Sequence, residues 1–305
     1  MLRGMTDAIA WLAEQQAAME KALAELVEIN SFTDNPEGGR KVGAMLEELF
    51  FVEGLSVARK SSEKFADHLV LSSRGTGDAP IALVGHLDTV FPPGTFEGFR
   101  RDGELARGPG VLDMKGGLVV VAFAIRALAQ SVGLAALPPL RLVIVADEEV
   151  GSPEGQAIIR EAAGDAKACL VFEAGRKADA IITRRKGTGG MKAVALGKAA
   201  HAGNAHKEGA NAIWAAAKFV DGVQRLTDYP RGVTVNVGKI AGGESKNTVP
   251  DRCEVFLDLR FETKADADAL VAKVHAIADE AAKSVEGTRI EISGGVARFP
   301  MERTD

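Results

Sequence analysis

The stretch Pro80–Gly117, PIALVGHLDTVFPPGTFEGFRRDGELARGPGVLDMKGG, decides the fold because two apolar segments in it meet polar residues abruptly. The apolar run 81–84 ends in GHLD at 85–88, which is typical of a buried strand followed by a turn. The Gly- and Pro-rich run GPGVLD at 108–113 opens the long apolar segment 118–128, which is long enough for a helix. Polar side chains that can bind a metal or transfer a proton therefore lie where elements begin or end, namely His86, Asp88 and Asp113.

Working outward from this stretch, strand-like and helical segments alternate through the first part of the chain. Such alternation predicts a mainly parallel, doubly wound α/β sheet with helices on both faces. The expected strands are 68–71, 81–84, 140–146 and 168–172, and the expected helices are 9–27, 42–49, 113–130 and 153–163.

The pattern changes after about Lys186, where the spacing of apolar residues predicts the order β-α-β-β-α-β. This order is typical of a two-layer α+β unit with one open sheet face. The expected elements are strand 190–196, helix 211–226, strands 233–240 and 252–261, a helix through 270–281 and strand 289–293. We therefore expect a first domain at 1–185, continued at 297–305, and a second domain inserted at 186–296.

Length and charge narrow the class of protein. The 305 residues are enough for two domains, and 42 acidic against 37 basic side chains give a net charge of -5. This balance argues against a nucleic-acid or anionic-membrane partner.

The first 29 residues contain no continuous apolar core of a signal peptide, so we expect a cytoplasmic protein. Cys169 and Cys253 have no CxxC spacing and are expected to be buried thiols.

Four segments place metal-type ligands after expected strands or at a helix start. In a parallel sheet the carboxyl ends of the strands share one edge, which is where ligands bind. An imidazole with several carboxylates and no thiolate suits zinc, or cobalt and manganese. Two divalent cations would neutralise the carboxylates and acidify a shared water. The segments contribute His86 with Asp88, Asp113, Asp147 with Glu148 and Glu149, and Glu173.

Taken singly, each of these residues has an ordinary structural explanation. His86 alone would be a hydrogen-bonded core histidine, and Asp113 alone a helix N-cap. Glu148 and Glu149 alone would be solvated loop charges. All of these residues are expected at one edge of the sheet, and that coincidence favours a metal site. Neighbouring residues point in different directions, so one of the two glutamates can bind metal while the other acts as a base.

The motifs GHLDTVFP, RGPGVLDMKGG, ADEEVGS, VFEAGR and GKAAHAGNAHKEGANAI resemble the M20 family of di-zinc metallopeptidases. The likeness is strongest to its glutamate carboxypeptidase (carboxypeptidase G2-like) branch, and it runs over nearly the whole chain in family order. It implies that His86 and Glu173 bind the first metal, Asp113 bridges both metals and Glu149 binds the second. Asp88 would hold the His86 ring, and the bond after Asp113 would often be cis.

The same resemblance implies the catalytic and substrate-binding residues. Glu148 would be the general base, and the inserted domain a lid through which two copies form a homodimer. His201 would reach the partner subunit's site and stabilise the oxyanion, although a loop histidine capping a strand end would look the same. Asn247 and Arg260 would hold the substrate's carboxylate.

Arg260 also has an argument from strand alternation. It lies on the face opposite the apolar residues of strand 252–261, where a planar guanidinium suits a carboxylate. The alternative is a surface ion pair with Asp258 or Glu254.

One feature departs from the family pattern. M20 enzymes end with a further catalytic-domain segment that carries a histidine ligand of the second metal, and this sequence stops at Asp305. His68, His206 and His275 are not placed to replace that ligand. We therefore expect an incomplete second metal site and low activity, in either a fragment or a naturally short chain.

The resemblance implies a hydrolase that cleaves the amide bond to a C-terminal glutamate-like residue of a peptide or N-acyl substrate. The alternatives are an N-acyl-amino-acid deacylase or desuccinylase of the same family, and a truncated homologue with weak or no activity that binds metal or dimerises. A nucleotide-binding protein is disfavoured because the sequence contains no GxxxxGK[ST].

Overall fold

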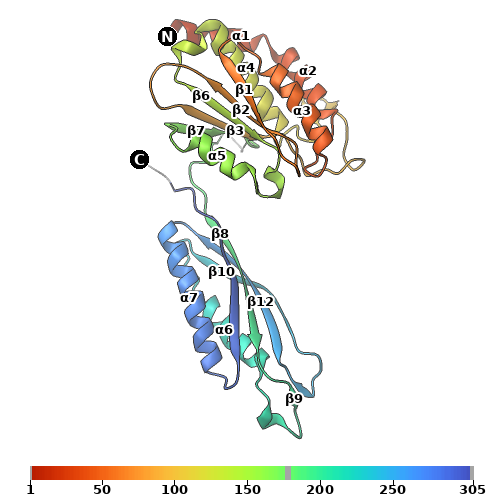
Figure 1. The fold of residues 1–305 in the computed structure, drawn as a ribbon, viewed down its shortest axis with the longest axis vertical. Helices are drawn as coiled ribbons and strands as arrows, with labels where there is room; N and C mark the ends of the chain where they lie inside the picture. Colours follow the sequence, from red (N-terminus) through yellow and green to blue (C-terminus); the bar gives the residue numbers. More distant parts are fainter. Residues whose placement is uncertain (1, 176–179, 303–305) are drawn as a thin grey trace. The chain divides into compact units, whose positions relative to one another are not determined.

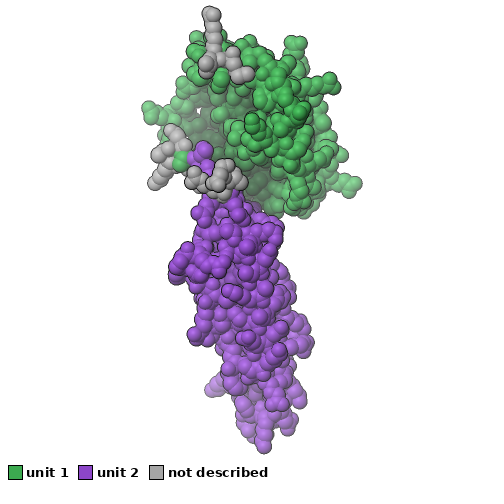
Figure 2. Space-filling view, turned by 90° about the vertical axis from the view of Figure 1, so that its left-hand side faces the viewer, with its two compact units in different colours: residues 1–180 green, residues 181–305 purple. Residues whose placement is uncertain are grey.

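The computed structural model describes residues 2–175 and 180–302. The chain divides into two compact units, 1–180 and 181–305, which Figure 2 shows in different colours. The sequence predicts this division slightly later, after residue 185.

Unit 1 is built on a five-stranded sheet of order β1-β2-β6-β3-β7 (Figure 1). The three strands β6, β3 and β7 are parallel, whereas β2 is antiparallel to both of its neighbours. The strands are β1 (Leu55–Lys60), β2 (His68–Ser73), β3 (Ile81–His86), β6 (Leu140–Val145) and β7 (Ala168–Val171).

Helices cover both faces of this sheet, as the sequence predicts. Alternation along β6 shows the two sides, because Leu142 and Ile144 belong to the main core whereas Val143 and Val145 pack with Ala162 of α5. The main core lies under the other helices, of which α4 has the longest buried face. The helices are α1 (Leu2–Ala13), α2 (Gln16–Val27), α3 (Pro36–Leu49), α4 (Lys115–Ser131) and α5 (Gly155–Ala163), with short 3-10 turns η1 (Leu134–Ala136) and η2 (Glu148–Val150).

The structure differs from the predicted elements in three places. The expected first helix is two helices, because the chain breaks between α1 and α2. Strand β1 and the hairpin β4 (Arg100–Asp102) and β5 (Leu105–Arg107) were not predicted. These strands are mostly exposed and carry several charged residues, so they lack the apolar alternation that identifies a strand in a sequence.

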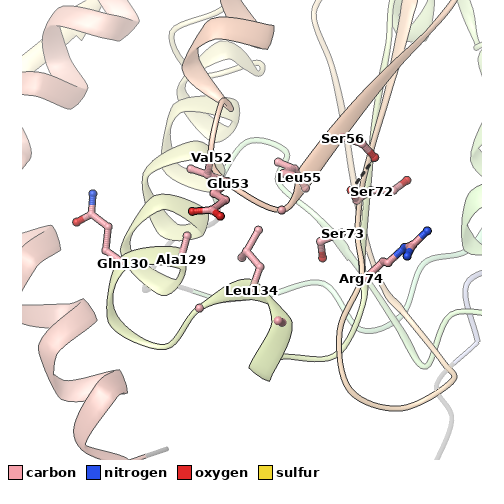
Figure 3. Close-up of a pocket in the computed structure, with 13 residues that line it drawn as sticks. Val52, Glu53, Leu55, Ser56, Ser72, Ser73, Arg74, Ala129, Gln130 and Leu134 are labelled. Carbon is pink, nitrogen blue, oxygen red and sulfur yellow. Dashed lines mark hydrogen bonds between the residues drawn. The ribbon is translucent and has the colours of Figure 1, made fainter.

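A broad hollow lies at the end of the sheet opposite His86 (Figure 3). It is lined by the turn before β1, the end of β2 and the end of α4, including Glu53, Arg74 and Leu134. The amide of Leu140, the first residue of β6, donates to Ser73 in this region. His86 ends β3, which runs parallel to β6, so the hollow and His86 lie at opposite ends of the strands.

Unit 2 is a two-layer α+β structure with the predicted order of its main elements. Its four-stranded antiparallel sheet has the order β10-β12-β8-β13, and α6 and α7 cover one face. Alternate residues of β12 are buried against these helices, which leaves the other sheet face open. The elements are β8 (Gly187–Leu196), α6 (Ala212–Gln224), β10 (Thr234–Gly242), β12 (Arg252–Phe261), α7 (Lys264–Lys283) and β13 (Arg289–Arg298).

A small ribbon extends unit 2 beyond the Arg252 end of β12. It pairs β9 (Ala200–His201) with β11 (Thr248–Val249), and the 3-10 turn η4 (His206–Glu208) comes shortly after β9. The ribbon lies at one end of the unit (Figure 1).

Two further sequence expectations can be compared with the structure. Cys253 is buried as expected, but Cys169 is exposed because β7 is an edge strand whose one partner among residues 2–175 and 180–302 is β3. None of the helices in the described part of the chain has the length and apolar character of a membrane span.

Candidate metal centre

His86 ends the buried strand β3 and is 1% exposed. Its ring Nδ1 lies 3.0 Å from the backbone oxygen of Asp88. A carbonyl oxygen can only accept, so Nδ1 donates, and Nε2 is the nitrogen that can bind a metal once it has lost its proton. Nε2 lies 3.1 Å from Oδ1 of Asp113 and 3.8 Å from Oε2 of Glu173. The ring therefore presents a ligand atom to two carboxylates from different segments.

Asp113 lies at the start of α4, and three neighbouring residues fix the backbone there. The Asp113–Met114 peptide is cis, as the family resemblance implies. The Met114 side chain is fully buried and its sulfur accepts the His86 amide at 3.1 Å. A Cβ on Gly116 would lie 2.3 Å from the Val111 oxygen, so only glycine allows this approach. Helix α4 is thus packed closely against the segment that carries Asp113.

Glu148 and Glu149 lie on the single turn η2, directly after β6. Their backbone amides both donate to the Asp88 carboxylate, at 3.2 Å each. The same carboxylate accepts from the Thr33 hydroxyl at 2.8 Å and lies 3.3 Å from Nδ1 of His86. Asp88 therefore joins the segment of His86 to the turn of the two glutamates.

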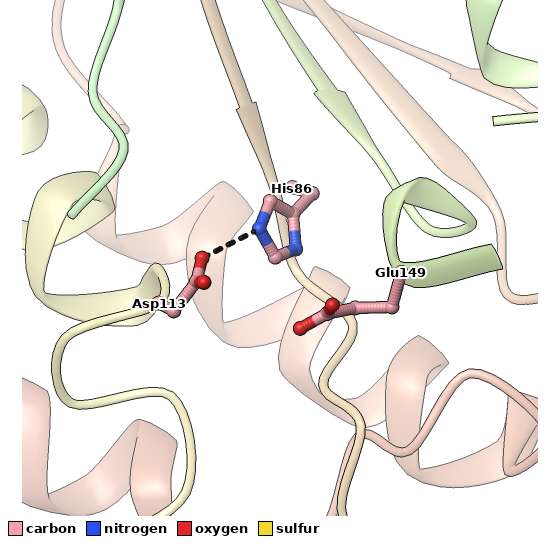
Figure 4. Close-up of side chains that lie close together, drawn as sticks. All are labelled: His86, Asp113 and Glu149. Carbon is pink, nitrogen blue, oxygen red and sulfur yellow. Dashed lines mark hydrogen bonds and ion pairs between the residues drawn. The ribbon is translucent and has the colours of Figure 1, made fainter. Parts of the chain in front are cut away.

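The structure brings His86, Asp113 and Glu149 together as a possible metal-binding group (Figure 4). One ligand atom from each lies within 4.8 Å of the others. Glu173, which follows β7, approaches the same ring nitrogen of His86. All four ligands predicted from the sequence thus lie at the carboxyl ends of β3, β6 and β7 or at the start of α4.

The pKa values reflect the charge gathered here. Burial opposes protonation of His86, but Asp88 and Glu173 outweigh it and raise its pKa to about 11. Burial raises the pKa of Glu149 to about 7; the positive charge of His86 opposes this rise, and repulsion from Asp113 offsets part of that opposition. Burial and a hydrogen bond with Glu173 likewise raise the pKa of Asp113. The ring and the carboxylates therefore retain protons that a cation would displace.

This donor set fits a divalent cation. It offers Nε2 of one imidazole, which faces the neighbouring carboxylates and can bind metal once deprotonated, and the other ring nitrogen is fixed by a backbone carbonyl. Metal-binding histidines in proteins are held in the same way. Imidazole and carboxylate ligands suit zinc, cobalt and manganese.

Some residues that hold this group were not predicted to do so. Lys115 is fully buried, and its ammonium donates to the carbonyls of Leu26 and Ile29 at 2.9 Å each. Burial lowers the pKa of Lys115 to about 8. Thr33 is also buried at the site. Asp147, which the sequence offers among the metal-type residues, is buried and accepts the amides of Glu154 and Gly155 at the start of α5. The sequence signal for Lys115 is weak: it is a lysine two residues after Asp113, at the expected start of a helix.

In unit 2 the structure brings His201 and Asn247 together on the small ribbon. His201 pairs with Thr248, and the amide of Ala202 donates to the Asn247 oxygen at 2.9 Å. Nδ1 of His201 accepts the amides of Gly203 and Asn204 at 3.1 and 3.2 Å. An accepting nitrogen carries no proton, so Nε2 of His201 is a donor.

Arg260 lies on the open sheet face, as alternation predicts, but far from the ribbon. It forms a bidentate ion pair with Asp258, at 2.8 and 3.1 Å. The ribbon lies beyond Arg252, and a strand rises by about 3.3 Å per residue, so Arg260 is roughly 26 Å further along β12. Within one chain, Asn247 and Arg260 do not meet around a single carboxylate.

Comparison with known proteins agrees with this architecture. Residues 183–286 match the M20 family model described as "Peptidase dimerisation domain". The chain is 30% identical over 263 residues to carboxypeptidase G2 from Pseudomonas sp. (strain RS-16), covering 84% of this chain and 63% of that protein. It is 32% identical over 207 residues to acetylornithine deacetylase from Myxococcus xanthus, covering 63% and 52%. The chain thus spans less than two thirds of the length of these relatives.

The fold is shared with a solved aminopeptidase PepT from Bacillus cereus ATCC 10987. The TM-score is 0.79 at 24% identity, covering 94% of this chain and 77% of that one. The sequence motifs, the dimerisation-domain match and the similarity to carboxypeptidase G2 agree with one another. Residues 183–286 therefore form an M20 peptidase dimerisation domain, and the chain as a whole is similar to carboxypeptidase G2 over 84% of its length.

Proposed function

We propose that this chain provides the metal centre of a hydrolase that cleaves the amide bond to a C-terminal glutamate-like residue of peptides or N-acyl amino acids. The observation that supports this most strongly is the group of His86, Asp113 and Glu149, with Glu173 beside the same ring nitrogen. Similarity to carboxypeptidase G2 supports the carboxypeptidase assignment.

The first metal would be held by His86 and Glu173, the second by Glu149, and Asp113 would bind both. Two divalent cations in these positions, with zinc as the expected metal, would polarise the scissile carbonyl and acidify the attacking water. Asp88 keeps Nδ1 of His86 and the turn of Glu149 in place through its contacts with both.

Glu148 would act as the general base. Its backbone is fixed by the bond to Asp88, directly beside the ligand Glu149. In this role its carboxylate takes a proton from the attacking water and passes it to the leaving nitrogen.

Substrate binding would use residues of two copies. The ribbon places His201 and Asn247 together, while Arg260 is roughly 26 Å away on the same strand system. If both groups serve one substrate, one copy supplies Arg260 and a second copy supplies His201 and Asn247. The dimerisation-domain match supports a homodimer of this kind. The Nε2 proton of His201 would then stabilise the oxyanion.

A second function is an N-acyl-amino-acid deacylase, and the similarity to acetylornithine deacetylase supports it. Both reactions would use the same metal centre and the same carboxylate contact. A panel of N-acyl amino acids that differ in side chain separates them, since a carboxypeptidase of this kind prefers glutamate and a deacylase of ornithine-like substrates does not.

The proposal is tested with Glu148→Gln, assayed on N-acyl-glutamates in the presence of zinc or cobalt. We expect kcat to fall by about 10²- to 10⁴-fold while the bound metal per chain is unchanged. Glu53→Gln, in the hollow at the other end of the sheet, is the matched control and should behave as the unsubstituted chain. Retention of full activity by Glu148→Gln would remove Glu148 as the base.

A further inference from the structure

We propose that His68 is a positioning residue that holds the turn carrying Glu148 and Glu149 in the geometry that metal binding and proton transfer require. His68 lies 18 residues before His86 in the sequence and is no part of the metal-binding group. This inference deepens the proposed function, and its functional consequence rests on that function.

His68 is a buried histidine aimed at the backbone just before the catalytic turn. It begins β2 and is 1% exposed. Its Nδ1 accepts the amide of Ala146 at 3.2 Å, across the β2–β6 pairing. Because Nδ1 accepts, the ring proton is on Nε2. That nitrogen has no hydrogen-bond partner within the described residues and lies 3.6 Å from Oε2 of Glu154.

The residue after Ala146 secures the other end of the same turn. Asp147 is fully buried, and one of its carboxylate oxygens accepts the amides of Glu154 and Gly155 at 2.8 and 3.0 Å. Its backbone oxygen accepts the amide of Ser152 at 2.8 Å, which closes the loop. The segment 147–155 is therefore closed by hydrogen bonds between its own two ends. The bond from the Ala146 amide to His68 connects the start of this segment to β2.

The two glutamates inside this closed segment both donate their backbone amides to Asp88. Their amides reach Asp88 at 3.2 Å each, near the long end of the normal range. Rotation of the 145–146 peptide, which carries the Ala146 amide, would shift the start of the turn and so move both side chains relative to Asp88. The bond from Ala146 to His68 opposes that rotation, since a buried amide left without a partner is unfavourable.

The imidazole has two separable contacts, which allows matched substitutions. His68→Asn can keep an acceptor close to the position of Nδ1. His68→Gln can keep a donor close to the position of Nε2 but removes the acceptor for Ala146. His68→Leu removes both while keeping an apolar side chain of similar size. If the bond to Ala146 is the one that matters, Asn should rescue and Gln should not.

The first measurement is amide hydrogen exchange of a peptide covering 147–152 in the metal-free chain. We expect exchange in this peptide to be at least tenfold faster in His68→Leu and His68→Gln, and unchanged in His68→Asn. This readout does not depend on metal or activity. Unchanged exchange in both His68→Leu and His68→Gln would overturn the inference.

The second measurement is zinc or cobalt affinity and the kcat and KM of folded protein. We expect a roughly 10-fold loss of metal affinity and a lower kcat with similar KM for Leu and Gln, as for other residues that orient metal ligands. Equal thermal destabilisation of all three variants with unchanged affinity and kcat would make His68 an ordinary core residue and contradict the inference. If His68→Leu does not fold, the comparison of Gln with Asn still decides.

Failure of the proposed function would look different. A wild-type chain that binds no metal and hydrolyses no N-acyl amino acid would contradict the proposed function, while the exchange measurement would still test whether His68 holds the turn.

Discussion

Asp88 holds Glu149 through its backbone: Oδ2 of Asp88 accepts the Glu149 amide at 3.2 Å, although the two residues are 61 positions apart. The other oxygen of the same carboxylate accepts the Glu148 amide and lies 3.3 Å from the His86 ring. Burial disfavours the charged form, but His86 and Thr33 outweigh it and lower the pKa of Asp88. Asp88 thus stays ionised and connects three residues of the site.

Asp88→Asn should weaken metal binding without unfolding the protein. The amide nitrogen of asparagine cannot accept, so one of the two backbone bonds to the turn is lost. We expect metal affinity to fall by about 10- to 100-fold, as for other residues that orient metal ligands. Competition with a chromophoric chelator measures this affinity.

Thr33→Val is the matched control for Asp88→Asn. It keeps the side-chain shape and removes only the hydroxyl that donates to Asp88 at 2.8 Å. The loss of affinity should be smaller than for Asp88→Asn. An equal or larger loss would show that Asp88 is not the main connection.

Gly117→Ala should disturb the segment that carries Glu173. A Cβ at Gly117 would lie 2.1 Å from the backbone oxygen of Phe172, so α4 and the end of β7 must separate. Overpacking of this kind costs about 1–3 kcal/mol, against roughly 1 kcal/mol gained from replacing a helical glycine. We expect lower thermal stability and weaker metal binding together.

Gly175→Ala is the control for Gly117→Ala, because Gly175 lies two residues after Glu173 and its Cβ would meet no atom within 4 Å. It should leave metal affinity and melting temperature unchanged. If both variants bind metal equally well, the close contact of α4 with Phe172 does not set the position of Glu173.

The candidate ligands could be picked out from the sequence because each ends or follows an apolar run or opens a helix. His86 ends a strand, Glu149 and Glu173 follow strands within a few residues, and parallel strands bring such residues to one edge. The residues around them were not predictable in the same way. Thr33 and Asp88 are 55 positions apart, and Lys115 contacts the carbonyl of Leu26 from 89 positions away. Local patterns carry no information about such pairs.

The order of elements in unit 2 could also be read from apolar spacing, whereas the relation of its functional residues could not. Matching motifs suggest that Asn247 and Arg260 act on one carboxylate. The register of β12 and the ribbon β9–β11 shows that they lie at opposite ends of the sheet. Only the pairing of strands reveals that two copies would be needed.

Metal affinity should rise with pH, with a steeper slope below pH 7. Metal binding requires deprotonated ligands, and the metal-free chain has a pKa of about 11 at His86 and about 7 at Glu149. Below pH 7 both groups release a proton on binding, and above it mainly His86 does. Calorimetry in buffers of different ionisation enthalpy counts these protons. A pH-independent affinity between pH 5.5 and 8 would contradict this assignment.

The contributions of His86 and Glu149 to the stability of the metal-free chain should fall as pH rises, whereas metal affinity rises. Both pKa values are raised on folding, so the folded state binds more protons than the unfolded state. The contribution of Glu149 is complete below about pH 4.5 and is lost as pH rises through about 7. Glu149→Gln should remove this loss, as urea unfolding at pH 5 and pH 7.5 would show.

Arg260→Lys should raise KM for substrates with a free carboxylate. A lysine ammonium cannot form the bidentate contact of a guanidinium, and we expect KM to rise about tenfold or more. Substrates whose carboxylate is converted to an amide should show little further change. Arg252→Lys, on the same face at the other end of β12, is the control and should leave KM unchanged. Equal effects on acid and amide substrates would exclude Arg260 as the carboxylate contact.

The most direct test of the metal centre is anomalous X-ray diffraction at the zinc edge from crystals grown with zinc. We expect an ion about 2.0–2.1 Å from Nε2 of His86 that is also bound by a carboxylate oxygen of Asp113. Zinc bound elsewhere on the chain, with His86 and Asp113 still in direct contact with each other, would contradict it.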